Sequence, residues 1–451
     1  MPLILGTNSI KDTGYDVDNS LRFNSGSSDY LNYSTGNSTT SSTKATLSAW
    51  VKRTSVGVNT CIFGHYQSNS LRSAIYINDD DDFLYFQNGT NIFLTNAKFR
   101  DASAWYHFVI TIDLTQGTAS NRVKVYVNGV QETSFATENY PSQNASDSIP
   151  NFGQQTVGAN IYNSSPDLYF NGYMAEVCFI DGQALAPTSF GEFDEDSGIW
   201  KPINVSGLTF GTNGFYLDFE DSSALGNDVA GSNNFTVNNL TAIDQSTDTC
   251  TNNFSTYNPL MVTQSATIPA FSEGNLKSTF NNAGLSLFAL STFAVSSGKW
   301  FAEFKMTNIS GGSDTYVGVV KDDANFSAES SPIANGTSYR GNGQRVISGS
   351  SASYGATYST GDIIGLALNC DDNEVVFYKN GASQGAVSIT ADTNYFMWTS
   401  DYNSKVIEAN FGSPPYTISS GNSDGNGYGN FEYAVPSGYY ALNTKNLAEF
   451  G

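Results

Sequence analysis

Two segments far apart in the chain share one sequence pattern: residues 122–129 (RVKVYVNG) and residues 374–381 (EVVFYKNG). In each, a run of β-branched and aromatic residues leads directly into Asn-Gly, the dipeptide that most readily adopts the positive φ angles of a tight type I′ turn. A third run of this kind, residues 83–89, is followed by residues 92–94, which are again apolar and aromatic. Helical periodicity is nearly absent elsewhere. These hairpin signals predict an all-β chain.

The length of the chain predicts more than one domain. At 451 residues it exceeds a single ordinary core, since domains contain roughly 100–200 residues each. Strand signals complete enough to close a sandwich lie on both sides of a stretch rich in Asn, Ser, Thr and Gly. We therefore predict two tandem jelly-roll β-sandwiches, whose parts are an arm at 1–16, a domain at 17–196, a connector with some β-structure at 197–262, and a domain with a C-terminal extension at 263–451.

The charge of the chain excludes several classes of partner. Its 42 acidic and 20 basic residues leave a formal net charge of −22, and a field of this sign repels phosphate backbones and anionic lipid surfaces. No stretch approaches the roughly 20 apolar residues of a membrane helix. We therefore expect neither nucleic-acid binding nor membrane insertion. The cysteines Cys61, Cys178, Cys250 and Cys370 lack C-x-x-C spacing, which favours buried free thiols over a zinc site and leaves their disulfide state open.

The first half of the chain has strand motifs in a distinctive order. They occupy residues 47–51, 105–109, 125–129 and 172–177. This order resembles the laminin-G-like, concanavalin-type jelly rolls over residues 17–196. The resemblance implies a two-sheet sandwich of a kind often used to bind sugars or proteins, sometimes with calcium at its rim.

The second half has five motifs that resemble the successive strands of a SPRY-type domain over residues 265–415. They are residues 298–304, 316–320, 361–368, 376–381 and 409–412. The resemblance again implies a concanavalin-like sandwich. Members of this family bind partners through loops at one rim and do not catalyse reactions.

Further segments resemble structural proteins of tailed bacteriophages, notably those of marine bacteria and cyanobacteria. They are residues 1–5, 216–223, 235–240 and 436–447. The resemblance implies a virion component, such as part of a tail fibre, a spike or a capsid-surface appendage. Its expected partners are other virion proteins, a host-surface glycan or protein, and further copies of itself. A secreted lectin-like adhesin and a degenerate glycan hydrolase remain as alternatives.

Catalysis is not expected. Glycan hydrolases of this fold place two or three carboxylates at alternate positions of one strand, so that the side chains enter the same cleft. Here Asp218 and Glu220 follow Tyr216, which stands where the first acid would be, and the spacing of Glu176 and Asp181 places them on opposite faces. His107 lies inside a strand, between two aromatic residues, and is interpreted as structural.

Aromatic residues near predicted loops are the candidates for ligand binding in the second half. They are Tyr339, Tyr354, Tyr358, Trp398 and Tyr402. An aromatic ring can stack on the apolar side of a sugar while neighbouring amides bind its hydroxyls, whereas the alternative for each of these rings is ordinary core packing.

The acidic run Asp79, Asp80, Asp81 and Asp82 is the candidate cation site, since calcium takes several carboxylate and carbonyl oxygens from a flexible loop. The alternative, which we favour, is a solvated flank of a hairpin without calcium. No other cofactor is expected.

A small apolar cluster, Leu3, Ile4 and Leu5, stands in the otherwise polar segment before the first predicted strand. We expect this arm to dock on a neighbouring protein of the particle, the alternative being a frayed terminus.

Overall fold

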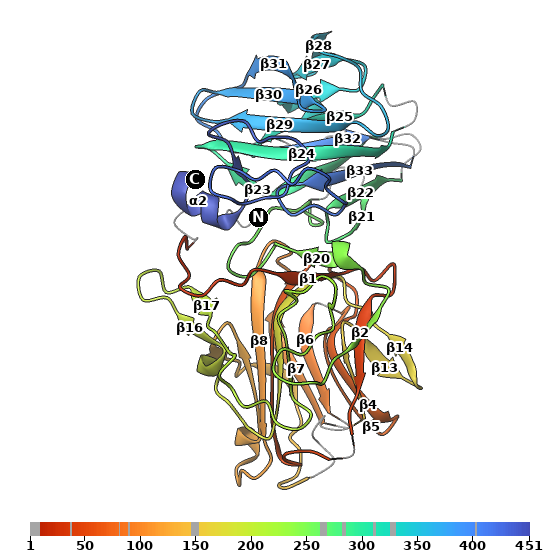
Figure 1. Ribbon diagram of the computed structural model, residues 1–451, viewed down its shortest axis with the longest axis vertical. Helices are drawn as coiled ribbons and strands as arrows, with labels where there is room; N and C mark the ends of the chain where they lie inside the picture. Colours follow the sequence, from red (N-terminus) through yellow and green to blue (C-terminus); the bar gives the residue numbers. More distant parts are fainter. Residues whose placement is uncertain are drawn as a thin grey trace. The chain divides into compact units, whose positions relative to one another are not determined.

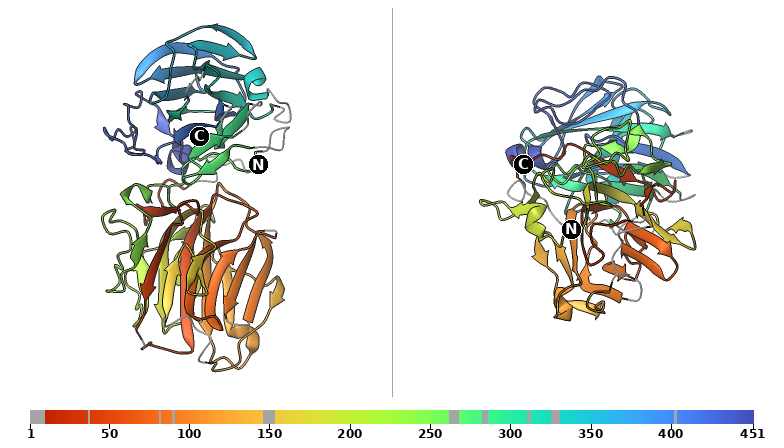
Figure 2. Two further views of the ribbon diagram at one scale, coloured as in Figure 1. Left: turned by 90° about the vertical axis from the view of Figure 1, so that its right-hand side faces the viewer. Right: turned by 60° about the horizontal axis from the view of Figure 1, so that its bottom comes forward.

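The computed structural model describes residues 10–36, 38–80, 82–88, 91–145, 153–261, 268–281, 286–309, 313–324, 331–401 and 404–451. The chain divides into two compact units. The N-terminal unit is Thr13–Thr251, and the C-terminal unit is Asn252–Gly451 together with the described residues before Thr13. β-Strands dominate each unit, which confirms the all-β prediction (Figures 1 and 2).

The N-terminal unit is built from two antiparallel sheets, here called N1 and N2. In order across N1 the strands are β10 (Val130–Gln131), β9 (Val123–Val127), β8 (Trp105–Asp113), β3 (Lys44–Arg53), β15 (Gly172–Asp181), β1 (Ser20–Phe23) and β20 (Gln245–Ser246), with β18 (Phe215–Leu217) also paired to β15. In order across N2 they are β11 (Phe135–Glu138), β7 (Asn91–Lys98), β6 (Phe83–Asn88), β5 (Leu71–Ile77), β4 (Thr60–Ser68), β12 (Gln154–Val157), β2 (Tyr30–Ser34) and β19 (Thr236–Asn238).

Smaller elements complete this unit. They are the hairpins β13 (Asn160–Tyr162) with β14 (Ser165–Asp167) and β16 (Gly191–Phe193) with β17 (Trp200–Pro202), and the short 3₁₀ helices η2 (Ala119–Asn121), η3 (Pro187–Ser189) and η4 (Ala242–Asp244).

The core of the N-terminal unit contains side chains from both N1 and N2. Phe63 of β4 and Phe179 of β15 are both buried, and their rings stack with centroids 5.9 Å apart. The period-two alternation of the strands explains this packing, because alternate side chains of each strand face the other sheet.

The Asn-Gly turns form as predicted. Asn128 and Gly129 have φ angles of 47° and 78° between β9 and β10, and Asn380 and Gly381 have 49° and 79° at the second turn. These are the positive values that a type I′ turn requires. β6 also pairs antiparallel with β7, as the third signal predicted.

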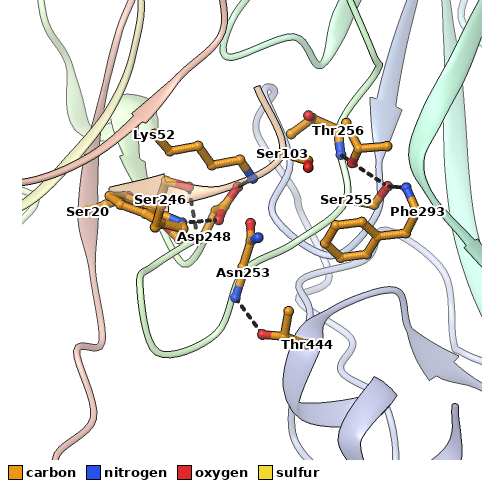
Figure 3. A network of polar contacts seen from close by, with 12 residues as sticks. Ser20, Lys52, Ser103, Ser246, Asp248, Asn253, Ser255, Thr256, Phe293 and Thr444 are labelled. Carbon is orange, nitrogen blue, oxygen red and sulfur yellow. Dashed lines mark hydrogen bonds and ion pairs between the residues drawn. The ribbon is translucent and has the colours of Figure 1, made fainter. Parts of the chain in front are cut away.

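Residues predicted to form part of the connector belong to the N-terminal unit as far as Thr251. Within them, β18 pairs with β15, β19 with β2 and β20 with β1. The next residues are held by buried groups: the Lys52 ammonium lies 2.6 Å from the Asp248 carboxylate, and the Ser20 hydroxyl donates to the Asp248 carbonyl at 2.6 Å (Figure 3). The boundary between the units therefore lies at residues 251–252.

The C-terminal unit also contains two sheets, here called C1 and C2. In order across C1 the strands are β21 (Ala270–Ser272), β22 (Lys277–Phe280), β33 (Lys405–Asn410), β24 (Lys299–Asn308), β29 (Ile363–Asn369), β30 (Glu374–Lys379) and β31 (Ala382–Ser388), with β34 (Tyr440–Ala441) parallel to β24. In order across C2 they are β23 (Leu287–Val295), β32 (Tyr395–Asp401), β25 (Tyr316–Lys321), β26 (Gly336–Arg340), β27 (Gln344–Ile347) and β28 (Ser350–Ser353).

Helices are short here. The α-helices of the unit are α1 (Ser331–Asn335) and α2 (Thr444–Phe450). Across the described residues, no helix has the length and apolar character needed to span a membrane.

The C-terminal extension packs on the outer face of C1. Phe431 of the extension is buried against Phe301 of β24, with ring centroids 5.2 Å apart. Glu303, also on β24, accepts the backbone N–H groups of Glu432 and Tyr433, each at 2.8 Å. Glu303 is fully buried, and this burial raises the pKa of its carboxyl to about 7.

We expect Glu303 to make stability depend on pH. Its folded-state pKa of about 7 exceeds the ordinary 4.5. The contribution of Glu303 to the free energy of unfolding is therefore fully present below pH 4.5 and is lost as the pH rises through 7. Glu303→Gln keeps an acceptor oxygen but cannot titrate. The difference in unfolding free energy between wild type and E303Q should therefore shift by about 3 kcal/mol toward the variant between pH 4.5 and 8, measured by denaturant titration. A constant difference would contradict this.

Candidate functional site

Three of the five predicted ligand-binding aromatics are buried. Tyr339 in β26 is fully buried and packs edge-on against Tyr358, with ring centroids 4.9 Å apart. The Tyr358 hydroxyl lies 2.9 Å from the carbonyl oxygens of Thr315 and Tyr339. Trp398 in β32 has no exposed surface. Tyr339 and Trp398 thus lie in strands, and Tyr358 lies in the segment between β28 and β29 with its ring buried. The expectation of exposed rings on rim loops is therefore not met for these three residues, because each ring packs in a hydrophobic cluster of the C-terminal unit.

The structure describes one of the other two predicted aromatics, Tyr354. Tyr354 is half-buried, packs against Tyr339 and donates its hydroxyl hydrogen to the carbonyl of Gly385 in β31. Tyr402 lies outside the described residues. The structure thus brings Tyr339, Tyr354 and Tyr358 together, but as a packed group.

The acidic run does not form a calcium site around Asp82. Its buried carboxylate lies 2.9 Å from the Arg53 guanidinium and 3.1 Å from that of Arg100. Asp79 and Asp80 are exposed, and Asp81 lies outside the described residues. Over the part of the chain that the structure describes, no group of three or more His, Cys, Asp or Glu side chains is placed to hold a metal ion. Asp82 is therefore a structural ion-pair partner.

Two of the acids weighed for catalysis, Glu176 and Asp181, accept hydrogen bonds from the chain's own donors. Glu176 sits in a bulge of β15 with φ of 51°, and the Tyr216 hydroxyl lies 2.8 and 2.9 Å from its carboxylate oxygens. Burial raises the pKa of Glu176 to about 7. Asp181 accepts hydrogen bonds from the Thr39 hydroxyl at 2.6 Å and the Thr40 N–H at 2.9 Å. Both carboxylates thus have local structural partners.

His107 is a structural histidine, as predicted. Its ring is fully buried and stacks on Trp50, with centroids 4.6 Å apart. Its Nδ1 accepts the Trp200 indole N–H at 3.0 Å, while Nε2 lies 2.8 Å from the Ser48 hydroxyl. Burial lowers the pKa of His107 to about 3, so the ring is neutral at physiological pH.

The predicted docking residues Leu3, Ile4 and Leu5 lie outside the described residues. The described part of the arm, residues 10–16, contacts the chain itself. Lys11 forms an ion pair with Glu449 at 2.9 Å, and the Tyr15 hydroxyl lies 3.3 Å from the Glu176 carboxylate.

A row of apolar and aromatic side chains crosses the outer face of N2. Tyr76 of β5 pairs with Tyr85 of β6, which pairs with Leu94 of β7, so the three side chains point to the same side. All three are half-buried, and the tyrosine rings stack with centroids 4.4 Å apart. In the next row, Gln87 pairs with Ile92, and both are half-buried. We call these five residues the tyrosine platform.

A hairpin rises beside the tyrosine platform on the same face. Gly64 of β4 allows its close approach, because a Cβ there would lie 2.6 Å from the carbonyl oxygen of Ala159, directly before β13. Beyond it, Tyr162 is 44% exposed, and the Arg72 guanidinium lies 4.6 Å from its ring centroid. The Asn69 amide donates to the Asn163 amide oxygen at 2.5 Å. The outer face of N2 thus has the tyrosine platform on one part and, over β4, a hairpin with aromatic and amide side chains.

Comparisons with known proteins find a matching family in each half of the chain. Residues 25–188 match the concanavalin A-like lectin/glucanases superfamily, and residues 299–413 match the SPRY domain. The chain carries a concanavalin-like domain followed by a SPRY domain. The first falls within the N-terminal unit and the second within the C-terminal unit. The tyrosine platform belongs to the concanavalin-like domain, since β5, β6 and β7 lie inside its matched range.

Individual relatives cover parts of the chain. Ran-binding protein 9 of Xenopus tropicalis is 30% identical over 120 residues, which are 26% of this chain and 22% of the relative. The chain thus spans about a fifth of the length of that curated relative.

Solved structures are similar at low identity. The SPRY domain of human HERC1 is 19% identical, with a TM-score of 0.27, covering 30% of this chain and 87% of that one. A candidate carbohydrate binding protein from Bacteroides ovatus is 17% identical, with a TM-score of 0.36, covering 50% of this chain and 59% of that one.

Proposed function

We propose that the chain is a non-enzymatic structural protein of a tailed bacteriophage particle, part of a tail fibre, spike or capsid-surface appendage, that binds glycans or proteins on the host surface. The resemblance of residues 1–5, 216–223 and 436–447 to phage structural proteins supports the virion role. The two domain types support a binding role. The observation that carries the proposal is the tyrosine platform, which leaves an aromatic row open on one sheet of the concanavalin-like domain.

The chemistry of the tyrosine platform suits an uncharged glycan. Apolar sugar faces pack on aromatic and aliphatic groups, and amides such as those of Gln87 and Asn163 bind sugar hydroxyls. The residues of the platform carry no charge. A net charge of −22 disfavours acidic glycans. We therefore assign neutral host-surface sugars to this face.

Replacing Tyr76 and Tyr85 together by alanine is expected to weaken binding of neutral glycans and of host cells at least about tenfold, because the stacked rings supply the apolar contact area. The measurements are a glycan array, followed by titration calorimetry with the best glycan found. Tyr126→Ala is the matched control, since Tyr126 is a half-buried strand tyrosine of N1. Unchanged affinity in the double variant would rule out the platform as the site.

The virion role has a separate test. Mass spectrometry of purified particles should detect the chain at a fixed ratio to the capsid protein, and labelling with an antibody should place it on the tail or capsid surface. Recovery of the chain from culture medium, with none in particles, would favour the secreted adhesin instead.

A further inference from the structure

Two edge strands of the SPRY domain lie on the same side of its sandwich. β28 ends sheet C2 and β31 ends sheet C1, and Figure 1 shows both strands at one end of the domain. The residues that follow β28 join them: the Tyr354 hydroxyl donates to the Gly385 carbonyl, and the Ala356 N–H donates to the Gln384 side-chain oxygen at 2.9 Å. The two edges therefore form one continuous side.

Among the residues that the structure describes, no strand pairs with the outer edge of β28. Ser348 and Gly349, with φ of 48° and 80°, form the two-residue turn before it, and Ile347 pairs with Ser350. Hydrogen-bonded and non-hydrogen-bonded pairs alternate from such a turn, so Ser351 and Ser353 direct their N–H and C=O groups outward. All four residues of β28 are exposed. An edge of this kind is a template for pairing with another strand.

The segments that contain β26, β27, β28 and β31 have no acidic residues although the chain is strongly acidic. Residues 330–361 and 375–391 contain no Asp or Glu, against 42 in the whole chain. Two of their cations are already neutralised, Arg340 by Asp314 and Lys379 by Asp362 at 3.3 Å. Two copies of a chain with net charge −22 can therefore approach here without opposing carboxylates. β28 also lacks the Lys, Pro or bulge that usually protects an edge strand.

We propose that β28 is a self-pairing edge, through which two copies of the chain join their C2 sheets antiparallel across a twofold axis, with β31 beside the junction. Across a twofold axis, β28 of one copy pairs with β28 of the other. An uncharged strand can do so without placing like charges opposite each other. An acidic partner protein is less well matched, because two of the three cations in these segments, Arg340 and Lys379, are already paired. The inference holds whether or not the tyrosine platform binds glycans.

The size of the edge sets the expected affinity. β28 and β31 supply 4 and 7 residues, fewer than the roughly 20–30 per side of a standard interface. We therefore expect a dissociation constant above about 1 μM for the isolated chain. In an assembly that holds copies close together, a high effective concentration would favour the same pairing.

Sedimentation velocity of the full chain over about 1–500 μM tests the proposal, since this range brackets a micromolar dissociation constant. Wild type is expected to shift from monomer to dimer. Ser351→Pro, which removes an outward N–H, and Ala352→Lys, which opposes two like charges, are expected to remain monomeric. Val130→Lys is the matched control, because Val130 is 61% exposed on the edge strand β10 and the charge change is the same.

Three results would overturn the proposal. They are a wild type that stays monomeric over the whole range, a dimer that survives Ala352→Lys, or a dimer that Val130→Lys weakens equally. Circular dichroism checks that each variant folds. If Ser351→Pro disturbs the sheet, Ala352→Lys decides, because its side chain is exposed and its backbone is unchanged.

Discussion

Replacing Asp248 by alanine is expected to lower the free energy of unfolding of the concanavalin-like domain by about 3–5 kcal/mol. The Lys52 ammonium lies 2.6 Å from the Asp248 carboxylate, and the two side chains are 0% and 1% exposed. The Trp105 indole N–H also donates to this carboxylate at 3.2 Å. Burial holds the pKa of Lys52 below its ordinary value even with Asp248 beside it. Removing the carboxylate would leave a buried ammonium without its nearest counter-charge.

Hydrogen exchange measured by mass spectrometry on the intact chain can separate the two domains. In Asp248→Ala, exchange in β3 and β1 should accelerate strongly, while exchange in β24 of the SPRY domain should be unchanged. Asp372→Ala is the control, since the Lys299–Asp372 pair is exposed by 33% and 65% and should contribute less than about 1 kcal/mol. A loss below about 1 kcal/mol in Asp248→Ala would show that water reaches Lys52.

This ion pair also explains why the extent of the first domain could not be predicted. Residues 241–251 contain many polar residues and isolated acids, which in sequence are typical of a linker. Their partners, Arg22 with Asp244 at 3.4 Å and Lys52 with Asp248, are about 200 positions away in strands of N1. No local pattern indicates a pairing of that separation, because it depends on how the whole sheet folds.

Local patterns did predict most of the architecture. The Asn-Gly turns and the period-two strands are short-range signals, and a hairpin turn fixes the register of the strands beside it. Each predicted hairpin accordingly appears in the sheets. The same alternation could also have revealed the tyrosine platform. Tyr76 lies between Ile75 and Ile77, and Tyr85 between Leu84 and Phe86, so the core residues on either side of each tyrosine place its ring on the other face.

The burial of Trp398 was not predicted, for a different physical reason. β32, with the sequence YFMWTSD, is buried at every position, so it shows no alternation from which to infer a covered outer face. A central strand with both faces covered gives a continuous apolar run. The buried cluster of Phe288, Tyr316 and Trp398 lies on the outer face of C2. The polar residues Thr399 to Asp401 that follow Trp398 are also buried in the strand.

Trp398→Ala is accordingly expected to destabilise the SPRY domain by about 3–5 kcal/mol, the usual cost of removing a large buried aromatic side chain. The Trp398 ring packs edge-on against Phe288, with centroids 5.9 Å apart, and stacks on Tyr316 at 6.2 Å. Its indole N–H has no hydrogen-bond partner among the described residues. Trp398→Phe thus removes no hydrogen bond and leaves a smaller cavity, so it should cost less than half as much.

Denaturant unfolding measures the stability of both Trp398 variants. Hydrogen exchange in β32 and β25 shows whether the loss lies in the SPRY domain. Binding to host cells is measured at a temperature where each variant remains folded. If Trp398 is a core residue, stability decreases from wild type to Trp398→Phe to Trp398→Ala, and binding is unchanged as long as the protein is folded. A ligand-contacting residue predicts the reverse pattern, in which Trp398→Ala keeps the stability of the wild type and loses binding. That second result would place Trp398 in the binding site.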